Sequence, residues 1–297
     1  MIRTVALLQV LVWPCLFLAS VLLLGLAIDS TQAFIGFNIV YICLALVLAV
    51  LERLIPFERS WLRNDGQWRA DILHTVFTKG CAQVVLAVGL AMGIAEVAAG
   101  QGHGLWPREW PLVAQVALGL ILADLGLYWA HRMAHAVHLF WRFHAIHHSV
   151  RRLWFLNTGR FHVVDAAVSI ALSQPILFAA GAPSDIFAWV TGITAFIGLL
   201  THSNIAMRTG LLNYVFNTPT LHRWHHSLDP AEGDKNFGEN IVLWDMVFGT
   251  YFNPNRRPST DIGIKENLPD DFLGQLAAPF RRRMLRLPEG VSGGQGS

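Results

Sequence analysis

Three groups of histidines carry the clearest chemical signal in this chain. Their patterns are HxxxH, HxxHH and HxxHH, and they contain eight of the 13 histidines. Imidazole is neutral near pH 7, is the commonest metal ligand, and suits iron, zinc and copper. The pattern therefore indicates a metal centre whose ligands are His131, His135, His144, His147, His148, His222, His225 and His226.

The spacing within each group favours two metals over one. Residues three and four apart lie on the same face of a helix, so each group can direct at least two rings to one side. Two adjacent histidines diverge by about 100°, which lets one group reach two neighbouring metals. A tetrahedral site takes four ligands, and eight exceed that need. We therefore expect two metals with four or five ligands each and positions left for oxygen or water.

Other metal chemistries fit the pattern less well. The chain has no HExxH, the zinc metalloprotease motif, and no Glu-x-x-His pair of the soluble carboxylate di-iron bundles. A membrane haem protein would place single histidines deep in facing spans, and a metal transporter would place its ligands mid-membrane. A membrane haem or zinc enzyme, and a metal-binding membrane protein without catalysis, stay open as alternatives.

The composition is that of a membrane protein. Apolar residues make up 54% of the chain and charged residues 14%, against roughly 25% charged residues in soluble domains. A helix needs about 20 apolar residues to cross a bilayer. The net charge of +2 gives no case for a nucleic-acid partner. We predict an all-α, polytopic membrane helical bundle with six spans, at residues 5–28, 33–51, 73–99, 111–130, 163–180 and 186–201.

The basic residues of the loops predict the orientation of these spans. Arginine and lysine are frequent after the second, fourth and sixth spans and scarce after the first, third and fifth. Because cytosolic loops carry the excess of positive charge, both termini are expected in the cytosol. All three histidine groups then share the cytosolic face, where they form a histidine-rich helical cap. If the last two spans are a shallow re-entrant pair, the groups still share one face.

The histidine groups and their flanks resemble a known family. WAHRMAH (129–135), LFWRFHAIHHS (139–149) and TPTLHRWHH (218–226) resemble the three histidine boxes of the fatty acid hydroxylase superfamily. This membrane di-iron group includes sterol desaturases, fatty acid hydroxylases, alkylglycerol monooxygenases and carotenoid hydroxylases. RFH (160–162), THSN (201–204), NFG (236–238) and WDMVFGT (244–250) resemble further family segments. In one departure, Asp165 stands where the family commonly has glutamate.

The resemblance covers residues 114–252 and suggests three regions. Residues 1–110 would hold N-terminal spans and a cytosolic loop, and residues 111–252 would form the di-iron domain. Residues 253–297 would be an amphipathic or disordered tail, with an amphipathic helix expected over residues 270–286.

What the resemblance implies is an oxidoreductase acting on a lipid. Two iron ions would use dioxygen and external electrons to hydroxylate a C–H bond, and desaturation by the same site is the alternative. The chain has no flavin, nicotinamide or cytochrome b5 motif, so the electron donor is expected to be a separate cytochrome b5-, ferredoxin- or reductase-like protein. Arg151, Arg152 and Arg223 could form its basic docking face, or could face solvent or lipid headgroups.

Four further residues are candidates for the site. The resemblance suggests His202 as a ninth ligand, at the cytosolic end of the sixth span. His162 is a tentative ligand, with a supporting or substrate-side role as the alternative. Ligating histidines usually donate their second N–H to a carboxylate or carbonyl, and a carboxylate inside a span is expensive. Asp124 and Asp245 are therefore expected to support the ligands, and a helix cap or salt bridge is the alternative for Asp245.

The three remaining histidines are not assigned to the metal centre. His138 lies next to the first box and is excluded because the resembling families often have an unrelated residue there. His74 and His103 are expected at the membrane interface.

Overall fold

The computed structural model describes residues 2–80 and 105–281, and this part of the chain is helical with no strand beyond isolated bridges. The predicted all-α class is confirmed. Five described helices are long and apolar enough to cross a membrane. They are α1 (Ile2–Ile28), α2 (Ala33–Leu54), α6 (Leu112–Ala136), α8 (Val163–Ala180) and α9 (Ser184–His202).

The third predicted span lies mostly outside the described residues. Its first residues belong to α3 (Trp68–Leu73) and to a π-helical turn, η2 (His74–Lys79). His74 was expected at the membrane interface, and its depth relative to the membrane stays a prediction. Its side chain is buried, with one ring nitrogen 3.0 Å from the Phe161 carbonyl and the other 2.9 Å from Gln275 Oε1. His103 lies outside the described residues.

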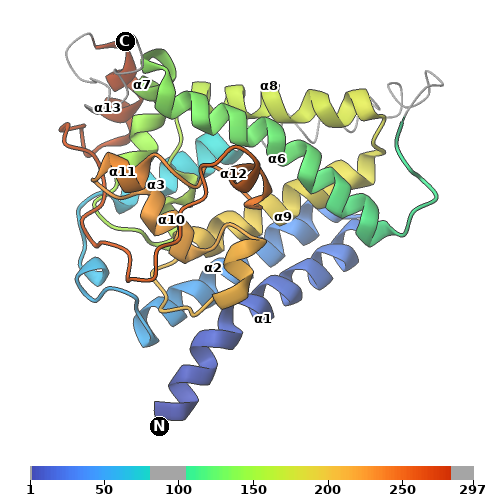
Figure 1. Cartoon of the computed structure of the whole chain (residues 1–297), viewed down its shortest axis with the longest axis horizontal. Coiled ribbons are helices and arrows are strands. Elements are labelled where there is room, and N and C mark those ends of the chain that lie inside the picture. Colours follow the sequence, from blue (N-terminus) through green and yellow to red (C-terminus); the bar gives the residue numbers. More distant parts are fainter. Residues whose placement is uncertain (1, 81–104, 282–297) are drawn as a thin grey trace.

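Helix α9 is the central helix of the bundle. It packs against α1, α2 and α6 (Figure 1), and its side chains Phe187, Phe196 and Leu200 are fully buried. By contrast, α1 and α2 leave many large apolar side chains exposed, including Leu22, Leu26 and Leu46. Helices that are apolar all round are typical of membrane spans, where these side chains would contact lipid.

Helices α6 and α8 cross at very close range. A Cβ on Gly126 of α6 would lie 2.2 Å from the Leu172 carbonyl oxygen of α8. Only glycine allows two backbones to approach so closely, and small residues are typical of membrane helix contacts. This contact fixes the N-terminal end of α8 beside the C-terminal end of α6, where the histidine boxes begin.

The ends of several long helices meet at one end of the bundle. Glu52, near the end of α2, accepts hydrogen bonds from the backbone N–H groups of Phe155 and Asn204, at 2.8 and 2.9 Å. The backbone N–H of Arg208 donates to the Gln9 carbonyl near the start of α1. At the opposite end, Arg108 contacts the carbonyl of Gly181 between α8 and α9.

Short helices collect at the end where α2, α6 and α9 finish, and we call this part the cap (Figure 1). It consists of η1 (Ser60–Leu62), α7 (His138–His148), η3 (Phe155–Gly159), η4 (Gly210–Tyr214), α10 (Pro219–His225), α11 (Pro230–Gly233), α12 (Leu243–Val247), α13 (Phe272–Ala277) and η5 (Ala278–Phe280).

The described C-terminal segment packs on the cap. Of the helix expected over residues 270–286, the structure shows α13 and η5, and the residues after 281 lie outside the described part. Asp271 caps α13 by accepting from the Gly274 N–H at 2.8 Å. The Phe272 ring meets the His74 ring edge-on with centroids 4.7 Å apart.

Candidate metal centre

Nine of the ten histidines proposed as ligands converge in two buried groups. Helix α6 supplies two of them, α7 three, α9 one, and α10 with its C-cap three. In each group the nitrogen atoms that could bind a metal lie within 4.8 Å of one another. These two groups are clusters in space and differ from the three histidine boxes of the sequence. We call the cluster of His131, His135, His144, His148 and His225 the first histidine group. The second histidine group is His147, His202, His222 and His226.

Carboxylates orient two rings of the first histidine group. His135 Nδ1 lies 2.9 Å from Asp234, and His144 Nδ1 lies 2.9 Å from Asp165. An imidazole that donates from Nδ1 to a carboxylate keeps its lone pair on Nε2, and the negative charge raises the basicity of that nitrogen. Asp165 thus reaches a histidine of the second box although it is shorter than the family's usual glutamate.

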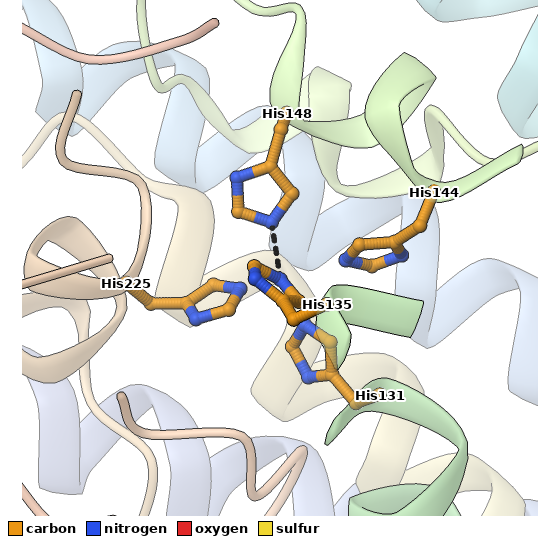
Figure 2. Close-up of side chains that lie close together, drawn as sticks. All are labelled: His131, His135, His144, His148 and His225. Atoms are coloured by element: carbon orange, nitrogen blue, oxygen red, sulfur yellow. Dashed lines mark hydrogen bonds between the residues drawn. The ribbon is translucent and has the colours of Figure 1, made fainter. Parts of the chain in front are cut away.

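Backbone carbonyls orient two more rings of this group. His131 Nδ1 lies 2.9 Å from the Phe237 carbonyl, and His225 Nδ1 lies 2.8 Å from the Lys235 carbonyl. Figure 2 shows the five rings turned toward one another. The Nε2 atoms of His131, His144 and His225 are buried and have no hydrogen-bond partner in the described part of the chain. Buried nitrogens of this kind are rare unless a ligand satisfies them.

The second histidine group converges through its Nε2 atoms. His222 Nε2 lies 2.8 Å from that of His202 and 3.1 Å from that of His226, which lies 3.2 Å from that of His147. Two nitrogens that each lie about 2.1 Å from one metal at right angles are about 3.0 Å apart. The His202 ring is held from behind by Asn157, whose Oδ1 lies 2.9 Å from His202 Nδ1.

Burial keeps these imidazoles in the form that binds metals. Burial first, and then repulsion from neighbouring imidazoles, holds the pKa values of His148 and His225 well below the ordinary value. The same causes lower the pKa values of His147 and His226 in the second group. Metal ligands must be deprotonated, so neutral rings with inward lone pairs fit two transition-metal ions.

Comparison with known proteins decides the family. A model of the fatty acid hydroxylase family matches residues 116–250. The ornithine lipid hydroxylase OlsE of Rhizobium tropici is 48% identical over 286 residues, which cover 95% of this chain and 86% of that protein. The chain belongs to the fatty acid hydroxylase family. The predicted family and the predicted oxidoreductase class are therefore confirmed.

Other members match over shorter stretches. Human alkylglycerol monooxygenase is 31% identical over 152 residues, which cover 51% of this chain and 33% of that protein. The probable Delta(7)-sterol 5(6)-desaturase of Neurospora crassa is 28% identical over 238 residues, which cover 74% of this chain and 62% of that protein. This chain thus spans less than two thirds of these two relatives. No solved structure matches it.

One proposed ligand lies outside both groups. His162 is the N-cap of α8, where its Nδ1 accepts a hydrogen bond from the Val164 N–H at 3.0 Å. Its Nε2 lies 3.2 Å from the Leu276 carbonyl of α13. Both ring nitrogens therefore have backbone partners, and the ring links α8 to the C-terminal segment.

The two carboxylates expected behind the ligands contact a cap segment instead of imidazoles. Asp124 Oδ1 accepts from the backbone N–H and the side-chain amide of Asn240, at 2.8 and 3.0 Å. Asp245 accepts from the backbone N–H groups of Phe237 and Gly238, at 2.8 and 2.9 Å. The Phe237 carbonyl faces His131 and the Phe237 N–H donates to Asp245. Asp245 therefore acts on the His131 ring through the backbone of Phe237 and not by the direct contact that had been predicted.

Three side chains lie directly behind the converging rings and were not among the predicted site residues, namely Asp165, Asp234 and Asn157. Asp165 had a signal, since it occupies the family's acidic position. Asp234 follows α11 and Asn157 lies in η3, and both reach their histidines only in the folded cap.

The expected basic docking face does not exist as a set. Arg152 is buried and lies 3.3 Å from Asp65. Arg223 is buried and donates to the Ser203 and Ile205 carbonyls. Only Arg151 of the three is exposed, and it pairs with Asp270.

Proposed function

We propose that this protein holds two iron ions, one in each histidine group, and hydroxylates a C–H bond of an amino-acid-containing lipid such as an ornithine lipid. The observation that carries the proposal is the presence of two separate sets of buried, converging imidazole nitrogens at the ends of membrane helices. The lipid class rests on the ornithine lipid hydroxylase that matches 95% of this chain.

The protein's own residues would orient the ligands and exclude water. Asp165, Asp234 and Asn157 would fix the ring planes from behind, as the Phe237 and Lys235 carbonyls would. All nine rings are buried, so the described part of the chain shields the centre from bulk water. The bound iron ions would supply the activation of dioxygen, and the protein would supply binding and orientation of the lipid. In this scheme His162, Asp124 and Asp245 position the cap and do not bind metal.

Hydroxylation is favoured over desaturation by the same site. Both reactions begin by removing hydrogen from a C–H bond, so the ligand geometry alone does not separate them. The relative that covers nearly the whole chain is a hydroxylase, whereas the desaturase is more distant and longer than this chain. A role in metal binding alone is disfavoured because the chain belongs to an enzyme family.

We infer that the cap and both termini lie in the cytosol. The basic loops of the sequence support this orientation. The contacts of Glu52 and Arg208 support one shared cap, because they bring the end of α2 and the start of α1 to the end where α9 finishes. A separate cytosolic electron carrier could then reach the cap directly.

The test is the reaction itself. Purified protein in lipid nanodiscs is loaded with iron and supplied with ornithine lipid, dioxygen and a ferredoxin or cytochrome b5 with its reductase. Mass spectrometry should show a product heavier by one oxygen atom, which the His147→Ala and His225→Ala variants do not form. A product lighter by two hydrogen atoms would indicate desaturation. No product from fully loaded enzyme with either donor would contradict the proposed substrate.

A further inference from the structure

A small cavity opens beside the second histidine group. Its volume is about 40 Å³, and its described walls include His147, His202 and His222 together with Phe161. The cavity also reaches Glu239, whose carboxylate lies 3.6 Å from His131 Nδ1 in the first histidine group. It therefore lies where the two groups meet, which is where a lipid C–H bond would have to be placed.

Two of the three threonine hydroxyls in the described cavity wall are available as hydrogen-bond acceptors. Thr194 and Thr201 line it from one face of α9, and each hydroxyl donates its hydrogen to a carbonyl of its own helix, at 2.8 and 3.0 Å. Their oxygen lone pairs remain as acceptors. Glu239 is the only acidic or basic side chain, histidines aside, among the described lining residues. An acceptor-rich wall with one carboxylate is complementary to a cation with several N–H donors.

Two buried carboxylates hold Glu239 in place from both sides. Asp245 accepts from Phe237 and Gly238 immediately before it, and Asp124 accepts from Asn240 immediately after it. A Cβ on Gly238 would lie 2.2 Å from the Ile241 carbonyl, so the segment turns too tightly for a side chain there. A functional side chain held this way keeps its geometry when a ligand arrives.

Glu239 contacts the first histidine group at longer range than the neighbouring backbone does. The Phe237 carbonyl lies closer to His131 Nδ1 than Glu239 does, at 2.9 against 3.6 Å, and the longer distance is beyond hydrogen-bond range. Glu239 also belongs to neither group of converging metal-binding atoms.

We propose that Glu239 binds the ammonium group of an amino lipid substrate and so selects lipids with a cationic headgroup. The inference rests on the proposed function and adds the residue that recognises the headgroup. A carboxylate in the cavity wall also offsets the repulsion between an ammonium group and nearby metal ions. The headgroup, held by Glu239 and the Thr194 and Thr201 hydroxyls, lies beside the second histidine group.

The test compares two lipids and two variants of the iron-loaded, full-length protein. The probes are an ornithine lipid with its free ammonium and the same lipid N-acetylated, which is uncharged. Glu239→Gln keeps the size of the side chain and removes its charge. Glu109→Gln, on an exposed loop at the opposite end of α6, is the matched control. Steady-state kinetics and native mass spectrometry of lipid binding give two independent measurements, and iron content is measured for each protein.

Glu239→Gln should raise KM for the ammonium lipid by about 10- to 100-fold, the effect typical of one charge-assisted hydrogen bond. It should weaken binding of that lipid similarly, with kcat within a few fold, unchanged iron content, and no effect on the acetylated lipid. Equal effects on both lipids, no effect, or loss of iron would overturn the role of Glu239. Failure of the wild-type protein to oxidise or bind the ammonium lipid would instead overturn the proposed substrate class.

Discussion

At the scale of single residues, hydrogen-bond partners at Nδ1 orient the converging histidine rings from the side that faces away from the centre of the cluster. In the first histidine group, two rings meet carboxylates through Nδ1 and two meet backbone carbonyls. Such contacts fix both the tautomer and the ring plane, so that Nε2 faces the centre before any metal binds. Burying an Nε2 atom without a partner costs free energy, and a hydrogen-bond partner or a bound metal ion would offset that cost.

Removing one of these supports should weaken metal binding without removing a ligand. Asp165→Ala takes away the partner of His144 Nδ1, and loss of such a support typically costs about 10- to 100-fold in metal affinity. Competition with a graded chelator series measures the affinity. Asp185→Ala, at the opposite end of the α8–α9 hairpin, should retain wild-type affinity. A chelator midpoint for Asp165→Ala equal to that of the wild type would rule out the support role.

The convergence of the histidines could be predicted from the sequence, but most of their hydrogen-bond partners could not. Spacing of three and four residues marks helical faces directly, and His202 followed from a matching segment. The Phe237 and Lys235 carbonyls carry no side-chain signal, because every residue has one. Asp124 looked like a support because it is a carboxylate inside a span, yet its partner is Asn240 in a loop 116 residues away.

At the scale of elements, the contact between α6 and α8 places the start of α8 beside the end of α6, which carries the first box. Gly126→Ala should lower the thermal midpoint, because its Cβ would meet the Leu172 backbone and overpacking costs about 1–3 kcal/mol. That loss should exceed the gain of about 1 kcal/mol in helix propensity. In Gly119→Ala the new Cβ would lie 2.9 Å from side-chain methyl groups, which can shift more easily than backbone. Its thermal midpoint should therefore fall less than that of Gly126→Ala. Thermal unfolding in detergent measures both, and an unchanged midpoint for Gly126→Ala would refute the close contact.

A buried ion pair joins α3 to the segment that supports His202. Arg160 Nε lies 2.8 Å from Asp71, and both side chains are 1% exposed. Asp71→Ala leaves the guanidinium buried without its partner, which should destabilise the protein by about 3–5 kcal/mol. Changing both residues to Leu should lower the free energy of unfolding by less than Asp71→Ala alone does, because no buried charge is then left unpaired. If the double change costs more in thermal unfolding, the pair is not the main interaction at this contact.

The apolar parts of the long helices could be predicted from the sequence, whereas the residues at which these helices end in the cap could not. The span expected to end at residue 130 continues to Ala136, so the first box lies on α6 itself. Likewise α2 continues past residue 51 to Leu54, which places Glu52 inside the helix. Hydropathy marks the part of a helix that lipid requires, whereas helices persist into a cap through packing and hydrogen bonds that hydropathy does not register.

At the scale of the whole molecule, the proposed orientation puts the cap and the start of α6 on opposite sides of the membrane. In a background with Cys15, Cys43 and Cys81 changed to Ser, Glu109→Cys should react with an impermeant maleimide in intact cells. Arg256→Cys, exposed on the cap side, should react only after the membrane is opened. The reverse pattern would invert the topology, and labelling of both in intact cells would exclude the assigned spans.

We propose that the chain holds two iron ions in two distinct histidine groups. Iron content of the purified protein, measured by mass spectrometry alongside an absorption spectrum, tests it most directly. We predict two irons per chain with no haem band, and a lower content for both His225→Ala, in the first group, and His147→Ala, in the second. The exposed-site control His138→Ala should keep both. One iron per chain in the wild type, or two irons retained when His147 and His225 are changed together, would contradict the account.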